Sequence, residues 1–346
     1  MTRLDTDGAV TTDVKTDCIG PQALLLEARE VPLGGVRAMS VRRALPQRDL
    51  PMVGAWCFLD RFGPQVTTMR VEPHPHVGLQ TVTWPFEGRV RHRDSIGSDV
   101  EVRRGALNLM TSGAGIAHSE YSVGEDAVPL DALQLWVALP EDRRHGGPTF
   151  EQHASLPEVR LDAEVGEPAD AVVVLGEFAG ATSPATVYTP IAGVEVRVPA
   201  GSTVRLPLRE DWEYAIVGVD GDLAVAASVD VPVDSDGAEP SDAPDDRPDA
   251  IEVGADRLLY LGQGRDGVEV ASTAGATLFV LGGEPFEDDI VMWWNFVGRS
   301  HDEIVAARED WEARSPRFGT VDGHDDVRIP APPMPAVRLT RRTRRF

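Results

Sequence analysis

The sequence of 346 residues is poor in cysteine, and this scarcity excludes two classes of protein. Only Cys18 and Cys57 are present. Two cysteines cannot form the disulfide framework of a small secreted domain, and they cannot form a cysteine-rich zinc site. One disulfide between the two residues is left open by the sequence.

Long apolar runs are missing as well. No stretch reaches the ~18 consecutive apolar residues of a membrane helix, and the first residues, MTRLDTDGAV, contain no apolar signal core. We therefore expect a cytoplasmic protein that makes no contact with a membrane.

Basic residues are scarce relative to acidic ones. The chain has 33 Lys and Arg against 56 Asp and Glu, which gives a net charge of −23. Binding to a nucleic-acid backbone needs concentrated positive charge, so direct nucleic-acid binding is not expected. Residues 228–250 hold eight acidic residues and one arginine, a local net charge of −7. This segment has low hydrophobicity and is predicted to be a disordered surface insertion.

Glycine and proline are abundant, with 33 and 27 residues. Both interrupt helices, and between them lie short apolar or alternating runs such as LQTVTWPFEG and VEVRVPAGSTVRLPL. Because 42 % of the residues are hydrophobic, these runs can build a packed core. Their spacing of about 8–12 residues predicts an all-β protein of antiparallel sandwiches or barrels.

Two sets of such runs, separated by a polar stretch that begins near Asp142, predict two β domains of similar size. One helix is expected after Pro285, with Ser300 as its N-cap and Glu303 completing a capping box. The tail has five arginines in its last nine residues. We expect it to be solvated and to meet the acidic body, with contact to an anionic partner as the alternative. The predicted organisation is a flexible arm (1–21), an N-terminal barrel (22–140), a connector (141–170), a C-terminal barrel (171–285) that contains the acidic insertion (228–250), a helical segment (286–320) and a Pro/Arg-rich tail (321–346).

Two pairs of good metal ligands stand in the first domain. His74 and His76 form an H-x-H pair, and His118 and Glu120 are spaced in the same way. Residues i and i+2 of a strand face the same side, so each pair can converge on one point. Taken alone, an H-x-H could be two ordinary polar residues at a strand edge, but a second pair in the same domain favours a metal site. Imidazole and carboxylate donors suit iron, manganese, nickel, copper or zinc.

The remaining histidines carry weaker signals. His92 is predicted either to lie beside the site or to be exposed at a strand end. Three others, His145, His153 and His324, lie in polar stretches and are interpreted as ordinary surface residues, whereas His301 is expected in the first turn of the C-terminal helix. No histidine occurs between His153 and His301, so the second domain is not expected to hold a matching site.

The segments PHPHVGLQTVTW, EGRVRHRDS, GALNLMTSGAGIAHSEYS and LQLWVALP resemble the pirins, a branch of the cupin superfamily, in content, order and spacing. The segment MWWNFVGRSHDEIVAAREDW resembles the end of bacterial pirins, so the resemblance extends over roughly 22–315. It implies two cupin barrels with one iron ion, Fe(II), in the first. The iron ligands of the family fall on His74, His76, His118 and Glu120, the same four residues that the spacing indicates.

Two positions depart from the family pattern. Gln80 stands where many cupins have a glutamate that can bind metal. In pirins the glutamate of the second motif takes this role, so Gln80 is expected to leave the site intact but more neutral. Ala114 stands where a larger or basic residue is expected, which would widen the pocket.

The resemblance implies two functions. The first is a dioxygenase of the quercetin 2,3-dioxygenase type, which opens the central ring of a flavonol-like aromatic substrate with O2, and in which Glu120 could act as the catalytic base. The alternative is a non-enzymatic, metal-dependent regulatory protein that binds a metabolic enzyme or a transcription factor. A protein that binds metal and has neither role is a third reading.

Apolar residues that could line the pocket are not separable from ordinary core residues in the sequence. The candidates are Phe58, Phe62, Met110, Ile116, Leu133, Leu135 and Trp136. Trp293 and Trp294 are adjacent, so on a strand they would face opposite sides, with one packing the C-terminal segment onto a barrel.

Overall fold

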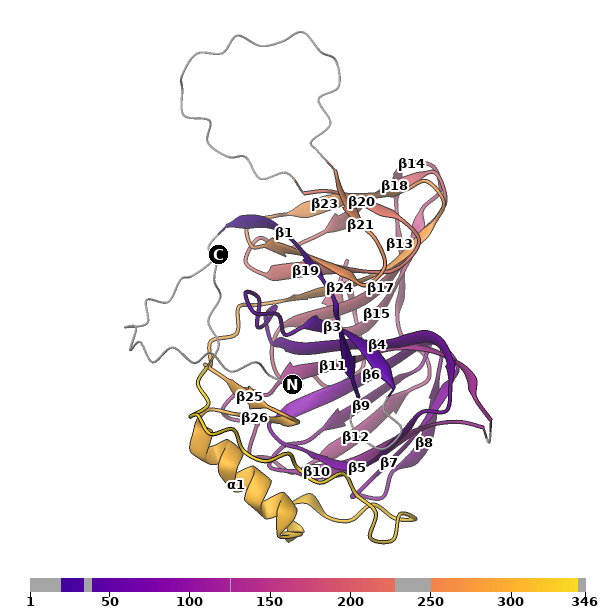
Figure 1. The fold of residues 1–346 in the computed structure, drawn as a ribbon. Coiled ribbons are helices and arrows are strands. Elements are labelled where there is room, and N and C mark those ends of the chain that lie inside the picture. Colours follow the sequence, from indigo (N-terminus) through magenta and orange to yellow (C-terminus); the bar gives the residue numbers. More distant parts are fainter. Residues whose placement is uncertain (1–19, 34–38, 125, 228–249, 342–346) are drawn as a thin grey trace.

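The structure is a computed structural model that describes residues 20–33, 39–124, 126–227 and 250–341. Figure 1 shows two stacked β-barrels, with the helix α1 on the outside of the N-terminal barrel. The predicted all-β class, with two barrels and one short C-terminal helix, is confirmed. The acidic insertion and nearly all of the N-terminal arm lie outside the described residues, so what we expect of them stays a prediction.

The N-terminal barrel is formed by two antiparallel sheets. The larger sheet has the strand order β12-β9-β6-β11-β4-β3-β2, and the smaller has the order β5-β10-β7-β8. Short, mostly buried runs rich in β-branched and aromatic residues build these strands. The bounds are β2 (Arg29–Pro32), β3 (Ser40–Leu45), β4 (Trp56–Thr67), β5 (Arg70–His76), β6 (Leu79–Glu87), β7 (Arg89–Asp94), β8 (Asp99–Arg103), β9 (Leu107–Thr111), β10 (Ile116–Ser122), β11 (Val128–Ala138) and β12 (Thr149–His153).

The C-terminal barrel also has two antiparallel sheets. The larger has the order β1-β22-β19-β24-β17-β15-β13, with β16 beside β15, and the smaller has the order β14-β18-β23-β20-β21. Its interior is filled by a cluster of buried aliphatic and aromatic side chains. The bounds are β1 (Pro21–Glu27), β13 (Glu158–Leu161), β14 (Ala163–Val165), β15 (Ala169–Phe178), β16 (Ala181–Thr182), β17 (Ile191–Val198), β18 (Ser202–Pro207), β19 (Glu213–Asp220), β20 (Leu223–Ala226), β21 (Ile251–Val253), β22 (Arg257–Gly262), β23 (Gly267–Ser272) and β24 (Ala276–Gly283).

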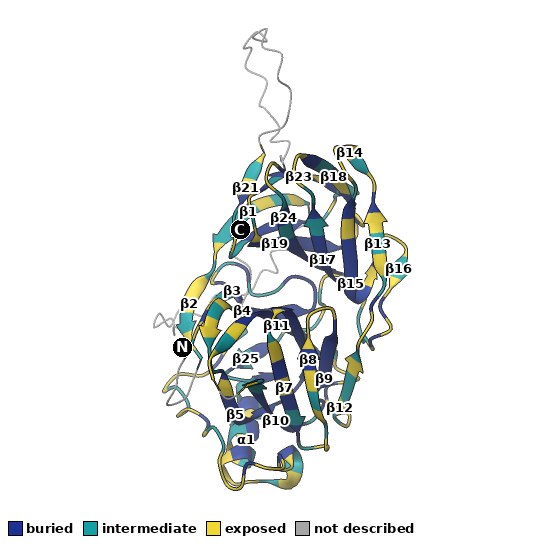
Figure 2. Cartoon of the chain, turned by 90° about the vertical axis from the view of Figure 1, so that its right-hand side faces the viewer, coloured by how far each residue is buried: buried dark blue, intermediate teal, exposed yellow. Residues whose placement is uncertain are grey.

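The large sheets of the two barrels face each other across a continuous core. This core contains side chains from both sheets, with Trp56 and Leu135 on one side and Tyr260 and Phe279 on the other. Figure 2 shows the strands on both sides of this junction as mostly buried. The two barrels therefore share one hydrophobic interface.

The observed strand pairing differs from two of the predicted domain boundaries. β1 falls at the start of the range predicted for the N-terminal barrel but pairs with β22 of the other barrel. The segment 141–170 is not only a connector, because it holds three strands. Of these, β12 pairs with β9 of the N-terminal barrel, whereas β13 and β14 pair with β15 and β18 of the C-terminal barrel. Each of these segments satisfies its backbone hydrogen bonds at a sheet edge.

The C-terminal segment covers the outside of the N-terminal barrel (Figure 1). It contains the strands β25 (Val291–Trp293) and β26 (Phe296–Gly298), the helix α1 (His301–Glu312) and the short 3-10 helix η1 (Pro316–Phe318). Its buried side chains form one cluster with Val77 and Ala117 of the barrel. The described part of the tail is only partly solvated, because Ala331 and Leu339 are buried, while Arg338 pairs with Asp302.

The two adjacent tryptophans do not lie on one strand. Trp293 ends β25, whereas Trp294 is in the following turn with a φ of 52°. Both tryptophans contact Phe296, so they pack on the same side, against the cluster of the C-terminal segment.

Cys57 is a free, buried thiol, and burial raises its pKa to about 12. No helix within the described ranges is long and apolar enough to cross a membrane.

Ser300 caps the helix α1 as predicted. Its Oγ accepts a hydrogen bond from the backbone N–H of Glu303 at 3.3 Å, while the Glu303 carboxylate accepts from the N–H of Arg299 rather than from that of Ser300. We expect Ser300→Ala to lower the free energy of unfolding by about 1 kcal/mol, and Ser300→Asn, which can still cap, to stay close to wild type. Urea denaturation measures both variants. Equal stability of Ser300→Ala and wild type would contradict the cap.

Candidate metal centre

Three neighbouring strands of the small N-terminal sheet carry a cluster of polar side chains. β10 lies between β5 and β7. In this register His118 of β10 pairs with His74 of β5, and Glu120 of β10 pairs with His92 of β7. Because side chains two residues apart share a face of a strand, His76 joins His74, and Glu120 joins His118.

The three histidines His74, His76 and His118 lie close enough to share one ion. Their ring centroids are 4.3 to 5.1 Å apart, and one ligand atom of each lies within 4.8 Å of the others. Glu120 belongs to a second group of the same tightness, with His118 and His92. All five side chains are at most 8 % exposed. The structure thus brings the three predicted histidines together and places Glu120 in an adjoining group, with His92, that shares His118.

The free ring nitrogens of this cluster fit a metal ion. Nδ1 of His74 is 2.9 Å from the carbonyl oxygen of Glu72, so Nδ1 carries the proton and Nε2 keeps its lone pair. His118 Nε2 and His76 Nδ1 are buried and have no hydrogen-bond partner among the described residues. A buried polar atom without a partner costs about 1–3 kcal/mol. A divalent cation would satisfy these atoms, and imidazole with carboxylate is a donor set that first-row metals accept.

Glu120 is held by a hydroxyl group. Thr83 Oγ1 lies 3.1 Å from Glu120 Oε1 and 3.2 Å from Gln134 Oε1. Burial raises the pKa of Glu120, against the opposing effects of His92 and of the Thr83 hydrogen bond. A cation beside Glu120 would favour the ionised carboxylate.

Burial keeps the histidines neutral. It lowers the pKa of His74 to about 4, and it lowers the pKa values of His76 and His118 well below the ordinary range, with smaller contributions from the neighbouring histidines. Only the neutral imidazole binds metal. At pH 7 protons therefore do not compete with a metal ion for these nitrogens.

The same shifts predict that acid destabilises the metal-free protein. A histidine whose pKa is lower in the folded state takes up a proton more readily when unfolded, so stability falls as the pH drops from about 6.5 to about 4. For His74 this amounts to roughly 3 kcal/mol. Urea denaturation across this window should show a shallower pH dependence for His74→Gln than for wild type. An exposed control, His145→Ala, should keep the wild-type slope, and identical slopes for all three proteins would contradict the assignment.

His92 is buried, so the alternative of an exposed strand-end residue is wrong. On β7 the side chains of Val90, His92 and Asp94 point inward, while Arg89 and Arg91 are exposed. The His92 ring stacks on Phe150, with centroids 4.5 Å apart. The alternation of the sequence RVRHRD contains this signal, because Val90 fixes the inward face.

His324 also differs from its interpretation as a surface residue. It is buried, and its two ring nitrogens lie 2.9 Å from Ser119 Oγ and 3.1 Å from Tyr121 Oη. Both partners are on the face of β10 that points away from His118 and Glu120. The sequence carries no signal for this contact, because about 200 residues separate the partners. Of the other histidines, His145 is exposed, His153 is part-buried beside Glu151, and His301 begins α1 as predicted.

The candidate pocket residues divide into several groups. Trp136 contacts His76 edge-on at 5.1 Å and stacks on Phe58 at 3.9 Å, so these two aromatic side chains lie beside the cluster. Leu133 and Leu135 belong instead to the core between the barrels. Phe62 lies in a separate core of the N-terminal barrel, and Met110 and Ile116 are buried.

Gln80 and Ala114, the two positions that depart from the family pattern, both take part in hydrogen bonds. The Gln80 amide donates to Thr111 Oγ1 and to the carbonyl oxygen of Thr186. Gln80 is therefore engaged away from the histidines. Arg317 of the C-terminal segment donates to the carbonyl oxygen of Ala114 at 2.6 Å, so a basic side chain reaches this loop from elsewhere in the chain.

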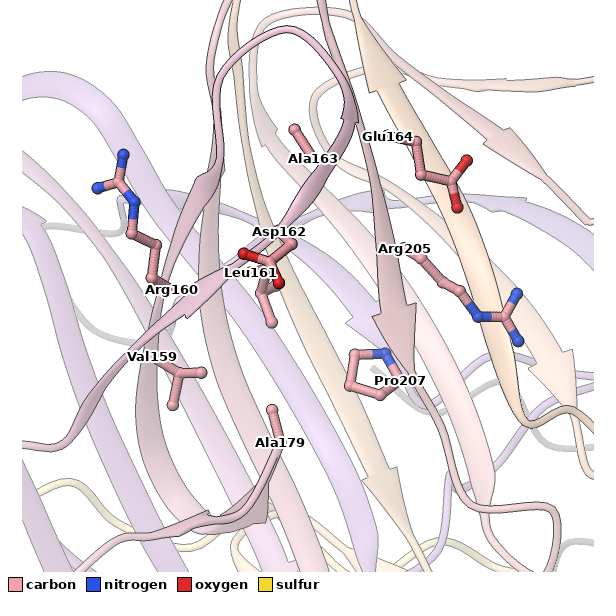
Figure 3. Close-up of a pocket in the computed structure, with 9 residues that line it drawn as sticks. All are labelled: Val159, Arg160, Leu161, Asp162, Ala163, Glu164, Ala179, Arg205 and Pro207. Carbon is pink, nitrogen blue, oxygen red and sulfur yellow. The ribbon is translucent and has the colours of Figure 1, made fainter.

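The described residues of the C-terminal barrel form no such cluster. Its range holds no histidine, and the metal-ligand groups found in the described ranges both lie in the N-terminal barrel. A shallow hollow on its surface is lined by residues of β13, β14, β18 and their surroundings (Figure 3). Figure 3 shows the guanidinium groups of Arg160 and Arg205 on opposite sides of this hollow, so its charges do not converge. The candidate metal ligands among the described residues therefore lie in the N-terminal barrel.

Two β-barrels, one of which holds a buried cluster of histidines and a glutamate that could bind a metal ion, define a bicupin protein. Residues 38–137 match the sequence profile described as Pirin, and residues 193–319 match that of the Pirin C-terminal cupin domain. A pirin-like protein of Caulobacter vibrioides is 32 % identical over 315 residues, which cover 89 % of this chain and 99 % of that protein. The chain belongs to the pirin family.

Two further relatives are named for an activity. A Pseudomonas aeruginosa protein, provisionally named a quercetin 2,3-dioxygenase, is 38 % identical over 312 residues, or 89 % of each chain. The crystal structure of a quercetin 2,3-dioxygenase from Acinetobacter baumannii superimposes with a TM-score of 0.79 at 35 % identity, covering 92 % of this chain and 97 % of that one.

Proposed function

We propose that the protein is a metal-dependent dioxygenase of the quercetin 2,3-dioxygenase type, with Fe(II) held by His74, His76, His118 and Glu120. The observation that carries this proposal is the buried convergence of the three histidines, with Glu120 in an adjoining group that shares His118. His118 Nε2 has no hydrogen-bond partner among the described residues. The names of the two relatives above support the activity. When bound, the metal would supply Lewis-acid and redox chemistry toward a flavonol-like substrate and O2.

Glu120 has the properties of a general base in this proposal. It is buried, its pKa is raised, and Thr83 holds one of its oxygens, so the carboxylate can take a proton from a substrate hydroxyl at a fixed position. Thr83 has one proton for two acceptors, Glu120 and Gln134. The Thr83 hydroxyl can therefore donate to the ionised Glu120 carboxylate and hold it in place. When Glu120 becomes protonated, the same hydroxyl can donate to Gln134 instead.

Aromatic side chains beside the cluster suit an aromatic substrate. Trp136 is in contact with His76 and stacks on Phe58, which places flat apolar surface next to the polar site. The acidic body gives no reason to expect an anionic polymer as the substrate. A flavonol-like molecule combines flat rings with hydroxyl groups that a base can deprotonate.

Oxygen uptake tests the proposal. With the Fe(II)-loaded protein and a panel of flavonols, we expect uptake that depends on both metal and substrate. Glu120→Gln should lower kcat about 10²–10⁴-fold while flavonol binding, measured anaerobically, persists. The exposed Glu101→Gln serves as the charge-matched control and should keep wild-type turnover.

Two outcomes would decide against parts of the proposal. Turnover of Glu120→Gln at the wild-type rate would exclude the base role. Absence of uptake by a metal-loaded protein would reject the dioxygenase and leave the metal-dependent regulatory protein, or a metal-binding protein with neither role, as the remaining candidates. No contact among the described residues favours that alternative over the enzyme.

A further inference from the structure

We propose that Asp94 and His92 are positioning residues that fix the tautomer of His118 through a hydrogen-bond chain, and so aim the lone pair of His118 Nε2 into the cluster. This inference rests on the metal site of the proposed function. The chain runs across two adjacent strands, from Asp94 and His92 on β7 to His118 on β10.

The chain starts at a carboxylate whose orientation is fixed. Asp94 Oδ1 accepts hydrogen bonds from the backbone N–H groups of Ile96 at 3.0 Å and Ser98 at 2.9 Å, in the turn that follows β7. This leaves Oδ2 facing His92 Nε2 at 3.1 Å. Asp94 is 3 % exposed, and its hydrogen bonds hold its pKa below the ordinary value despite burial. An ionised carboxylate only accepts, so His92 Nε2 carries the proton of that ring.

The remaining links follow from the chemistry of neutral imidazole. With its proton on Nε2, His92 has a lone pair on Nδ1, which lies 3.2 Å from His118 Nδ1. His118 must therefore donate from Nδ1, and its lone pair is then on Nε2. His118 Nε2 is the buried atom that has no partner among the described residues. The stack of His92 on Phe150 of β12 holds the intermediate ring in this orientation.

The side chains of this hydrogen-bond chain could instead bind a second metal ion. His92, His118 and Glu120 could hold a second ion, since their ligand atoms lie within 4.8 Å of one another. That arrangement would need a lone pair on His118 Nδ1, and the 3.2 Å contact to His92 would no longer be a hydrogen bond. Asp94 fits both arrangements, because a proton on His92 Nε2 leaves the Nδ1 lone pair to accept from His118 or to bind an ion. The number of metal ions that the protein binds decides between them.

Asp94→Asn is the sharpest test, because it should reverse every link of the chain. The amide oxygen is expected at the position of Oδ1, where two N–H groups require an acceptor, and the NH2 group then faces His92 Nε2. His92 would carry its proton on Nδ1 and donate to His118 Nδ1, and the proton of His118 would move to Nε2, which faces the cluster. Replacing carboxylate by amide beside a histidine is known to impose the other tautomer.

We expect this variant to bind Ni(II) or Fe(II) 10–100-fold more weakly than wild type in an anaerobic competition titration. In ¹⁵N-histidine NMR spectra of the metal-free proteins, His118 should be the Nδ1–H tautomer in wild type and the Nε2–H tautomer in Asp94→Asn. The matched control is Asp99→Asn, an exposed carboxylate of the same sheet that pairs with Arg91 and should change neither readout. His92→Phe keeps the stack on Phe150, removes the acceptor, and should also weaken binding at least 10-fold.

Circular dichroism shows whether Asp94→Asn folds. If that variant does not fold, the metal affinity of His92→Phe tests the hydrogen-bond chain. Metal affinity within twofold of wild type in the folded variant, or an Nε2–H tautomer of His118 in the wild type, would overturn the inference. Two bound equivalents in wild type that fall to one in His92→Phe would overturn it in favour of the second ion. A wild-type protein that binds no metal would instead reject the proposed function.

Discussion

His118→Ala is expected to bind a divalent metal ion at least about a thousandfold more weakly than wild type. His118 lies on the central strand of the small sheet, is 1 % exposed, and is the one residue shared by both ligand groups. Its loss removes one ligand and leaves a gap in the middle of the cluster. A loss of about 4 kcal/mol in binding free energy corresponds to this factor. Anaerobic titration with Fe(II) and Ni(II) against a chelator of known affinity measures it.

The control for this experiment is another histidine of the same barrel. His153 on β12 is part-buried and pairs with Glu151, outside the cluster. His153→Ala should therefore keep wild-type affinity. If His118→Ala bound metal as tightly as His153→Ala, the metal would have to be held somewhere else in the protein.

Trp56→Ala is expected to lower the free energy of unfolding by about 3–5 kcal/mol, the cost of truncating a large buried aromatic side chain. Trp56 is fully buried in the core between the two barrels. Its Nε1 is 3.1 Å from the carbonyl oxygen of Ala192 and 3.2 Å from that of Gly282, both in the C-terminal barrel. One side chain of the first barrel thus contacts two strands of the second. Urea denaturation followed by fluorescence and by circular dichroism measures the effect.

Gly193, which lies against the Trp56 ring, offers a second test of the packing between the two barrels. A Cβ atom at Gly193 would lie 2.9 Å from Trp56 Cζ2, so Gly193→Ala should push the ring out of place and destabilise the protein by about 1–3 kcal/mol. Gly254→Ala, where a Cβ atom meets nothing within 4 Å, is the control and should be nearly neutral. Equal stability of the two alanine variants would show that the two barrels do not pack through Trp56.

The β class and the H-x-H and H-x-E pairs could be predicted because both depend on short-range periodicity. Alternating runs between glycines and prolines identify strands, and the same period of two places His74 with His76 and His118 with Glu120. Strand pairing depends on contacts between distant residues, and periodicity does not encode them. This is why β1, at the start of the chain, joins the second barrel, and why the segment 141–170 contributes strands to both barrels.

The polar surroundings of the cluster were the least predictable part. Val90 before His92 gives an inward face, but the flanking arginines of RVRHRD make the run resemble an exposed edge. His324 comes from the tail and reaches Ser119 only through the tertiary fold. Which apolar residues lie near the site was equally undetermined, since Leu135 and Trp136 are adjacent in sequence and point to different cores.

The most direct test of the metal centre is the metal content of the protein purified without added metal, compared between wild type and His76→Ala. We predict close to one equivalent of a first-row divalent metal in wild type and a loss of most of it in His76→Ala. Fewer than about 0.2 equivalents in wild type, or the same content in both proteins, would contradict the assignment of His74, His76, His118 and Glu120 as its ligands.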